Sequence, residues 1–363
     1  GIHAIIHEAQ RLQSNNETLP SLALQRACHS TLKHLEHALR QSSHVVDKSI
    51  LEAYFDLHFF HRLISANLES IQLLPDPSNS NPSNSDQTTA RQKNNDHIAL
   101  CCVDPSPLLH PLWQRLGGVV LYSGTLQPVS YYQRLLGLSD GKTASFLRSF
   151  AEQVHTEVIP LDLRYRQRTQ HIPAIMTAIM RMCTLKPGNH FIFFSSYAFM
   201  QQVHQQFVAQ HPSIETHIQT HRMSLTERMR FLDKFQPEPS GNRVGFVVMG
   251  GVFGEGVDLP GDRLKGVMLV SIALPTPDAR AQAIEQYFTD QEGSGFAYAY
   301  LYPSLCRTLQ ASGRLIRTDE DEGVLMLVDR RFAQATFTDA FAAYQPILPS
   351  HEENDYTEDG CYL

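Results

Sequence analysis

Two arginines three residues apart are the clearest chemical signal in this sequence. They are Arg314 and Arg317, within residues 310–317, which read Gln-Ala-Ser-Gly-Arg-Leu-Ile-Arg. On a helix, positions i and i+3 share a face, so we expect both side chains to reach one anion. Two guanidinium groups at a terminal phosphate would stabilise the charge that develops during phosphoryl transfer. A solvated helix face paired with the acidic residues 319–321 is the alternative.

A glycine-rich segment with two carboxylates follows the apolar run at residues 244–249. Residues 250–261 contain five glycines together with Glu255 and Asp258. Glycines allow sharp turns and let backbone amides approach a ligand closely. The carboxylates could hold a sugar hydroxyl, a cation or a neighbouring arginine. The segment is longer than a turn requires, so we predict a ligand-binding loop rather than a plain glycine-rich connection.

Hydroxyl-bearing side chains follow two further apolar runs, at residues 190–194 and 118–122. They are Ser195, Ser196, Tyr197, Ser123 and Thr125. Hydroxyls at a strand end that precedes a helix can bind phosphate together with the free backbone amides there. A simple helix N-cap explains the first group equally well.

The chain after residue 151 alternates short apolar runs with amphipathic stretches. The runs lie at residues 158–161, 190–194, 216–219, 244–249, 266–270 and 324–328. This pattern predicts an α/β fold, with a parallel sheet covered by helices on both faces. Because ligands of such sheets bind beyond the carboxyl ends of the strands, we expect the loops that follow the strands to carry function.

The N-terminal part of the chain has a different pattern. Residues 13–72 carry apolar side chains three and four positions apart, which predicts helices. Residues 75–97 are rich in Ser, Asn, Pro and Gln, which predicts a disordered loop. Apolar runs predict strands at residues 4–6, 98–103 and 118–122.

Composition excludes some classes of protein. The net charge of −7 gives no global attraction to nucleic acid, so binding would need a local basic strip such as Arg164 and Arg166. Six cysteines without a CxxC pair fit a reducing cytoplasm. No apolar run has membrane-spanning length, and the histidine spacing fits no metal site. Residues 346–363 form an acidic tail that we expect to be loose.

The order of the motifs resembles superfamily 2 helicases of the XPD/DinG branch. The matching patterns are Ser-Gly-Thr-Leu-x-Pro, Phe-x-Ser-Ser-Tyr, Gly-Gly-x-Phe-x-Glu-Gly-x-Asp-x-Pro-Gly and Gln-x-x-Gly-Arg-x-Ile-Arg. The resemblance implies a motor of two RecA-like domains that uses ATP and Mg²⁺ and moves 5′ to 3′ on single-stranded or forked DNA. We expect it to act as a monomer in the cytoplasm, without a membrane.

The resemblance also implies domain ranges. Residues 1–12 and 98–150 would close the first RecA-like domain. Residues 13–97 would be a helical, arch-like insertion, and residues 151–345 would form the second RecA-like domain.

The resemblance implies a role for each matching residue. Arg314 and Arg317 would contact the γ-phosphate, and Gln310 would link the nucleotide to the cleft. Further nucleotide-side and coupling residues would be Gly251, Glu255, Gly256, Asp258 and Gly313. Ser123 and Thr125 would transmit the nucleotide state. The residues nearest the DNA strand would be Ser195, Ser196, Tyr197, Arg164 and Arg166.

Two departures from the family pattern matter. The Walker A loop and four iron–sulfur cysteines would lie upstream of Gly1, and with the apolar start of the chain this leads us to expect a fragment. Residues 5–10, Ile-Ile-His-Glu-Ala-Gln, stand where the family has an Asp-Glu-Ala-His motif. Glu8 matches the glutamate that positions the attacking water. His7 replaces the aspartate that holds magnesium, and imidazole is a poor ligand for this ion.

These departures leave alternatives open. The first hypothesis is the C-terminal part of an ATP-dependent DNA helicase with weakened hydrolysis. The second is a hydrolysis-deficient module that binds nucleic acid or protein. Residues 1–12 could also be an ordinary strand that merely resembles the motif.

Overall fold

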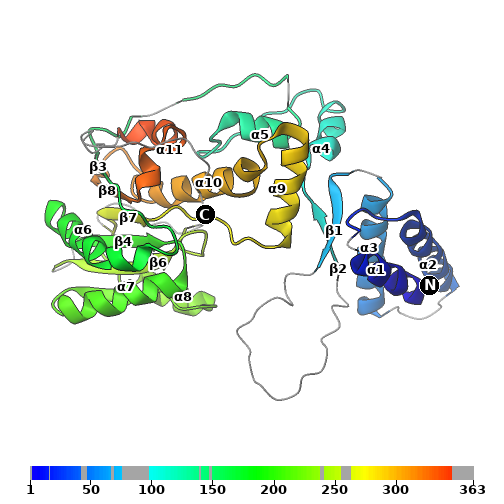
Figure 1. Ribbon diagram of the computed structural model, residues 1–363, viewed down its shortest axis with the longest axis horizontal. Helices are drawn as coiled ribbons and strands as arrows, with labels where there is room; N and C mark the ends of the chain where they lie inside the picture. Colours follow the sequence, from blue (N-terminus) through cyan, green and yellow to red (C-terminus); the bar gives the residue numbers. More distant parts are fainter. Residues whose placement is uncertain are drawn as a thin grey trace, which may run out of the picture. The chain divides into compact units, whose positions relative to one another are not determined.

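The protein is described by a computed structural model (Figure 1). The described residues are 2–15, 17–41, 47–66, 69–75, 98–138, 140–146, 149–237, 241–254 and 263–345. They form two compact units. The first takes its described residues from Gly1–Leu121, Ser130–Gly141 and Thr276–Ala299, and the second from Tyr122–Val129, Lys142–Pro275 and Tyr300–Leu363. Residues 76–97 of the predicted loop at 75–97, the tail at 346–363 and residues 255–262 lie outside the described residues.

The second unit is built on a parallel sheet with the strand order β3-β8-β7-β4-β6-β5. Every neighbouring pair is parallel. The strands are β3 (Val154–Ile159), β4 (Asn189–Phe194), β5 (Glu215–Ile218), β6 (Arg243–Val248), β7 (Gly266–Val270) and β8 (Gly323–Val328). All residues of β4, β7 and β8 are buried, as near-continuous apolar runs require. The predicted parallel α/β sheet is confirmed.

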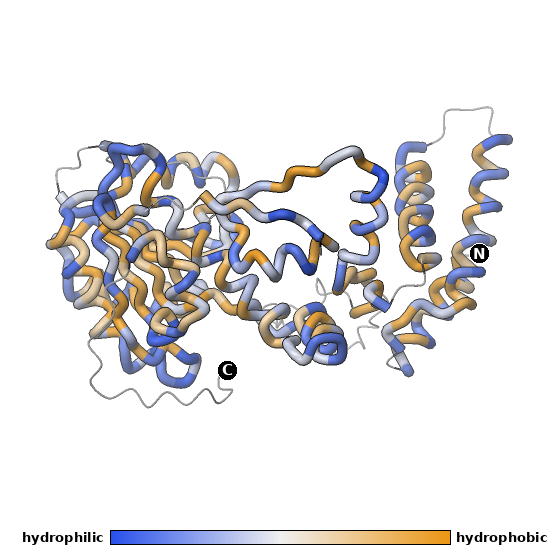
Figure 2. The backbone as a smooth tube through the Cα atoms, turned by 90° about the horizontal axis from the view of Figure 1, so that it is seen from above, coloured by the Kyte–Doolittle hydropathy of each residue, from blue (hydrophilic) through white to orange (hydrophobic). Residues whose placement is uncertain are grey.

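Helices cover both faces of this sheet. Helices α6 (Ile172–Leu185) and α7 (Tyr197–Gln210) share one apolar core with side chains of the central strands. Helix α10 (Tyr302–Ser312) contacts β7 from the other face (Figure 1). Figure 2 shows hydrophobic (orange) and hydrophilic (blue) residues alternating along the backbone. The other helical segments of this unit are η2 (Arg168–His171), α8 (Leu225–Leu232), η5 (Arg330–Ala333), α11 (Ala335–Ala340) and η6 (Ala342–Tyr344).

Local sequence fixes where these helices begin. Ser224 and Glu227 form a capping box at the start of α8, with each side chain bonded to the other residue's backbone N–H. Ser196 caps α7 by accepting a hydrogen bond from the backbone N–H of Phe199. Since both helices begin just after strand ends, their first turns lie at the carboxyl edge of the sheet.

The first unit combines helices with a two-stranded antiparallel sheet. Its elements are α1 (Ile2–Ser14), α2 (Leu22–Gln41), α3 (Lys48–Ile64), β1 (Ile71–Pro75), β2 (Ile98–Cys102), α4 (Ser106–Trp113), α5 (Val129–Leu135) and α9 (Ala279–Glu292). One small core joins the three N-terminal helices to β1 through Leu12, Leu24, Ile64 and Leu73. A second core packs Ile284 and Tyr287 of α9 against the strands. The short π-helix η4 (Ala297–Leu301) follows α9.

A buried carboxylate joins three segments of the first unit. Asp104 is 1% exposed and lies 2.9 Å from Nη2 of Arg134 in α5. Its Oδ2 also accepts a hydrogen bond from the hydroxyl of Tyr287 at 3.2 Å. Arg134 pairs in turn with Glu292, which accepts a hydrogen bond from Tyr298. The network fixes α5 and α9 to the segment that follows β2.

Two predicted strands of the N-terminal part are wrong. Residues 4–6 lie in α1, because Ile2, Ile5 and Leu12 are spaced for a helix face and Leu12 is 1% exposed. Residues 118–122 form no strand, and no described strand pairs with them; Tyr122 is 91% exposed. The helices predicted within residues 13–72 are confirmed by α2 and α3, although the last two residues of that stretch begin strand β1. The assignment of residues 1–12, 13–97 and 98–150 to named domains stays a prediction.

Helix α9 packs on β1, so residues 276–299 belong to the first unit, although the predicted range 151–345 includes them. No helix among the described residues is both long enough and apolar enough to span a bilayer.

Candidate functional site

The predicted glycine loop begins at the carboxyl end of β6. Gly250 adopts a φ of 67°, in the left-handed region that glycine tolerates. The backbone N–H of Gly251 bonds back to the carbonyl of Val248 at 3.3 Å, and that of Gly254 bonds to Gly251 at 2.9 Å. The loop therefore folds back on itself over the strand end. Glu255, Gly256 and Asp258 lie outside the described residues.

Arg314 contacts this loop directly. Its Nε and Nη2 both donate to the carbonyl oxygen of Gly254, at 3.1 and 2.8 Å. The predicted shared helix face of the two arginines is wrong, because α10 ends at Ser312 and Gly313 is its C-cap. Arg314 and Arg317 lie in the turn that follows the helix.

Arg317 is placed by different contacts. Its backbone N–H and that of Thr318 donate to Oδ2 of Asp321, at 2.6 and 2.7 Å. Asp321 is 5% exposed, so this carboxylate stabilises the turn between α10 and β8. Asp321, one of the acidic residues 319–321, thus contacts Arg317 through its backbone.

Arg307 is a further arginine of the site that the motif analysis missed. A Cβ added to Gly250 would lie 3.2 Å from Cδ of Arg307, and Nη1 of Arg307 donates to the carbonyl of Ala273 at 3.4 Å. It precedes Arg314 by seven residues, about two helical turns. That spacing is the signal that could have identified it. Gln310, on the same helix, is half-buried.

A buried amide connects Tyr197 to the strand that carries the glycine loop. Nε2 of Gln219 donates to the hydroxyl of Tyr197 at 2.7 Å. Oε1 of Gln219 accepts from the backbone N–H of Val248 at 2.9 Å. Gln219 is 3% exposed, and burial raises the pKa of Tyr197. Ser195 is half-buried beside this group, while Ser196 acts as a helix cap.

The predicted basic strip is only partly available. Nη2 of Arg164 pairs with Asp162 at 2.7 Å, and the hydrogen bond from Arg164 lowers the pKa of that carboxyl. Arg166 is exposed. The guanidinium of Arg168 lies 4.5 Å from the ring centre of Tyr165 and 4.8 Å from that of Phe199.

A buried ion pair holds the carboxyl ends of β7 and β8 together. Arg331 pairs with Asp329 at 2.7 Å, and both side chains are at least nine-tenths buried. Nη2 of Arg331 also donates to the hydroxyl of Ser271 at 3.0 Å. Ser271 has a φ of 73°, which is unusual for a residue with a side chain. Arg331 therefore holds the segments after β7 and β8 together through Ser271 and Asp329.

The remaining predicted residues have local contacts of their own. Ser123 and Thr125 bond to each other, with hydroxyl oxygens 3.4 Å apart. Glu8 belongs to the first unit, where it pairs with Arg11 at 2.8 Å and accepts from Ser21 at 2.7 Å. The hydrogen bond from Arg11 lowers the pKa of Glu8.

The described residues fit the phosphate part of a nucleotide better than its metal. Arginine and loop amides suit phosphate oxygens. No group of three or more His, Cys, Asp or Glu side chains able to hold a metal ion occurs in the described ranges.

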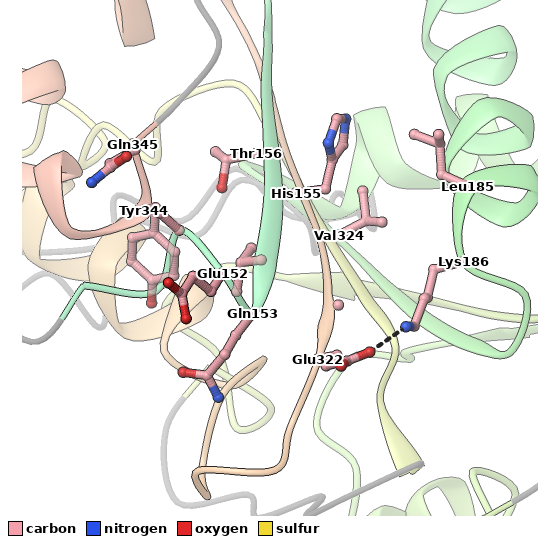
Figure 3. A pocket seen from close by; sticks show the side chains of 13 residues that line it. Glu152, Gln153, His155, Thr156, Leu185, Lys186, Glu322, Val324, Tyr344 and Gln345 are labelled. Atoms are coloured by element: carbon pink, nitrogen blue, oxygen red, sulfur yellow. Dashed lines mark hydrogen bonds and ion pairs between the residues drawn. The ribbon is translucent and has the colours of Figure 1, made fainter.

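A pocket of about 540 Å³ lies at the other edge of the sheet. Figure 3 shows it at the amino ends of β3 and β8, where Lys186 and Glu322 form an ion pair at 2.7 Å. His155 and Tyr344 line it from opposite sides of β3. Ligands of parallel sheets bind at the carboxyl edge, so we do not assign the nucleotide to this pocket.

Comparison with known proteins gives a family match for the second half of the chain. Residues 179–346 match the helicase C-terminal domain family. The XPD helicase subunit of general transcription and DNA repair factor IIH from Arabidopsis thaliana is 23% identical over 262 residues, which cover 65% of this chain and 34% of that protein. The ATP-dependent DNA helicase DinG from Photobacterium profundum is 25% identical over 229 residues, covering 61% and 32%.

The chain thus spans about a third of the length of these curated relatives. Among solved structures, one titled as an XPD helicase superposes with a TM-score of 0.55 at 16% identity. The superposition covers 95% of this chain and 64% of that chain, and at this identity it shows a shared fold. Sequence match and shared fold agree: residues 179–346 match the helicase C-terminal domain family, and the chain is similar to the C-terminal region of XPD/DinG-type superfamily 2 helicases, with a RecA-like α/β fold.

Proposed function

We propose that this chain is the C-terminal portion of an ATP-dependent DNA helicase. It would couple ATP hydrolysis to 5′-to-3′ movement on single-stranded DNA and to unwinding of forked duplexes. One observation carries the proposal: an arginine suited to phosphate and a tyrosine suited to a strand are both connected to the end of β6 and the loop that follows it. Arg314 contacts Gly254, and Tyr197 is joined through Gln219 to Val248.

Arg314 has the chemistry to respond to a phosphate. A carbonyl oxygen is a neutral acceptor, whereas a terminal phosphate is charged and accepts from guanidinium more strongly. Transfer of hydrogen bonds from Gly254 to phosphate would release the loop from the end of α10. Because the loop follows β6 directly, its movement would also displace Gln219 and Tyr197, which are hydrogen-bonded to the end of β6. Nucleotide state and strand contact would change together.

The rest of the nucleotide site would come from outside this sequence. The sequence contains no GxxxxGK[ST] phosphate loop, and the curated relatives are about three times longer than the matched segment. We propose that a second RecA-like domain of the same protein supplies that loop, the magnesium ligands and any iron–sulfur cluster. The protein would act as a monomer in the cytoplasm.

The decisive experiment measures ATP hydrolysis by the complete reading frame, with and without single-stranded DNA. We expect the strand to stimulate hydrolysis. A metal-replete protein that binds the strand but never hydrolyses ATP would contradict the motor function.

A hydrolysis-deficient binding module is the second candidate, and two observations favour it. His7 stands where the resembling motif has aspartate, and Glu8 is engaged by Arg11 and Ser21. The module predicts strand binding that is indifferent to ATP. The His7→Asp variant separates the cases: hydrolysis that appears only in this variant identifies the module, and strong hydrolysis by the parent identifies the motor.

A further inference from the structure

We propose that His221 and Tyr197 form a stacking platform for one unpaired base of a single strand, and that Gln219 fixes the platform to β6. The inference rests on the proposed function, since it names the part of the strand that this edge of the sheet recognises. His221 carries no motif signal in the sequence and lies in the connection that follows β5.

The two rings are already stacked. Their centroids are 3.6 Å apart, and the ring planes are inclined by 30°. Tyr197 is half-buried beneath, and His221 is exposed. An exposed aromatic ring supported from below offers a flat surface, and every base has a π-face that can stack on it.

Gln219 holds the lower ring in place. Both ends of its buried amide are used, one by the hydroxyl of Tyr197 and the other by the backbone N–H of Val248. A Cβ on Gly251 would lie 3.3 Å from Nε2 of Gln219, so the amide also touches the glycine loop. A ring fixed in this way loses little conformational entropy when a base stacks on its partner.

The surroundings suit a strand more than a free nucleotide. β5 is the outermost strand of the sheet, so its carboxyl end is at the rim, where a polymer can pass. Arg222 and Arg228 follow His221 closely, and Arg222 is exposed in a left-handed conformation with a φ of 55°. The nearby carboxylate of Glu227 is engaged by Ser224 in the capping box of α8. Base stacking beside cationic side chains is how non-specific single-strand sites are built.

The test measures binding of two fluorescently labelled strands of equal length, an oligothymidylate and an abasic phosphodiester. We expect His221→Ala to weaken oligothymidylate binding by about 5- to 150-fold, the range of one lost base–aromatic stack, and to leave the abasic strand unaffected. His221→Phe keeps a flat ring and should retain oligothymidylate affinity. Unchanged binding of the abasic strand by His221→Ala shows that this variant is folded.

His211→Ala is the matched control. His211 also contacts a ring, that of Phe207 at 4.9 Å, but it follows the C-terminal end of α7 at the amino edge of the sheet. The His211→Ala variant should bind the oligothymidylate and the abasic strand as tightly as the parent protein does.

The outcomes separate this inference from the proposed function. A parent that binds neither strand overturns both. Parent binding that His221→Ala leaves unchanged, or weakens equally for both strands, overturns the platform alone. A raised KM for ATP with unchanged oligothymidylate affinity would assign the ring to the nucleotide base and also overturn it.

The link to β6 has its own readout in Tyr197→Phe. This variant keeps the ring but removes the hydroxyl that meets Gln219. We expect oligothymidylate binding to persist while the ratio of strand-stimulated to basal ATP hydrolysis falls at least about threefold, which corresponds to the loss of one net hydrogen bond. An unchanged ratio overturns the link.

Discussion

Arg314 grips the backbone of Gly254 with two hydrogen bonds to one carbonyl oxygen. Seven residues earlier, Arg307 lies against Gly250. The end of α10 therefore meets both ends of the described part of the glycine loop. Any displacement of α10 is expected to move the loop, because two side chains connect them rather than one.

Loss of the Arg314 guanidinium should remove most catalysis. We expect Arg314→Ala to lower kcat of strand-stimulated ATP hydrolysis in the complete protein at least about 100-fold, the scale of an arginine that stabilises phosphoryl-transfer charge. Arg181→Ala is the control, since Arg181 is 56% exposed and pairs with Glu157. A variant that keeps half of the parent kcat would show that Arg314 only stabilises the loop.

A side chain at Gly250 should lower the stability of the second unit. Gly250→Ala combines a left-handed backbone with a contact to Arg307, so we expect a loss of about 1–2 kcal/mol in the free energy of unfolding. Urea denaturation followed by far-ultraviolet circular dichroism measures it. Gly241→Ala is the control, because a Cβ there meets nothing within 4 Å. Equal stability of the two variants would contradict the conformational argument.

The Asp104–Arg134 pair should stabilise the first unit. We expect Asp104→Asn to lower its free energy of unfolding by about 2 kcal/mol, less than for a fully buried pair because Arg134 is 32% exposed. The single tryptophan of the sequence, Trp113, lies in α4 of this unit, so its fluorescence reports the unit selectively. Glu52→Gln, in an exposed pair with Lys48, should change stability by less than about 0.5 kcal/mol. Equal effects of the two substitutions would refute this role.

The second unit should lose stability in mild acid through His190. Burial in β4 lowers the pKa of His190 from 6.5 to about 4. Above pH 6.5 the ring is neutral in both states. Between pH 6.5 and about 4 the unfolded chain binds a proton that the folded chain does not, so stability falls as pH falls.

The expected cost is about 1.4 kcal/mol per pH unit below 6.5, or roughly 2 kcal/mol at about pH 5. Urea midpoints measured at about pH 7 and pH 5 test this. His190→Leu cannot titrate and should lose that share of the pH dependence. If parent and variant lose the same stability in acid, His190 is not the group responsible.

The sequence was sufficient to predict the sheet of the second unit. Strands buried on both faces leave continuous apolar runs, and the runs at residues 190–194 and 266–270 coincide with β4 and β7 almost to the residue. The helix start at Ser224 was equally readable, because a capping box depends on two side chains close in the sequence.

The errors arise where structure depends on distant partners. An apolar run such as residues 118–122 forms a strand only when another strand pairs with it, and the run itself does not reveal whether a partner strand is present. Helix α10 ends at the C-cap Gly313, so Arg314 and Arg317 lie beyond the helix rather than on it. Gln219 and His221 are joined to Tyr197 only by tertiary contacts, so no local pattern indicates them.

The position of α9 limits how this protein can be dissected. Its apolar side chains Ile284 and Tyr287 pack beside β1, although more than 180 residues separate the two elements. A truncated protein that begins with the second unit would keep α9 and lose β1. The apolar face of α9 would then be exposed to solvent, and we expect the truncated protein to aggregate during expression. Deletion variants should therefore remove residues 276–299 together with the N-terminal segment, or keep both.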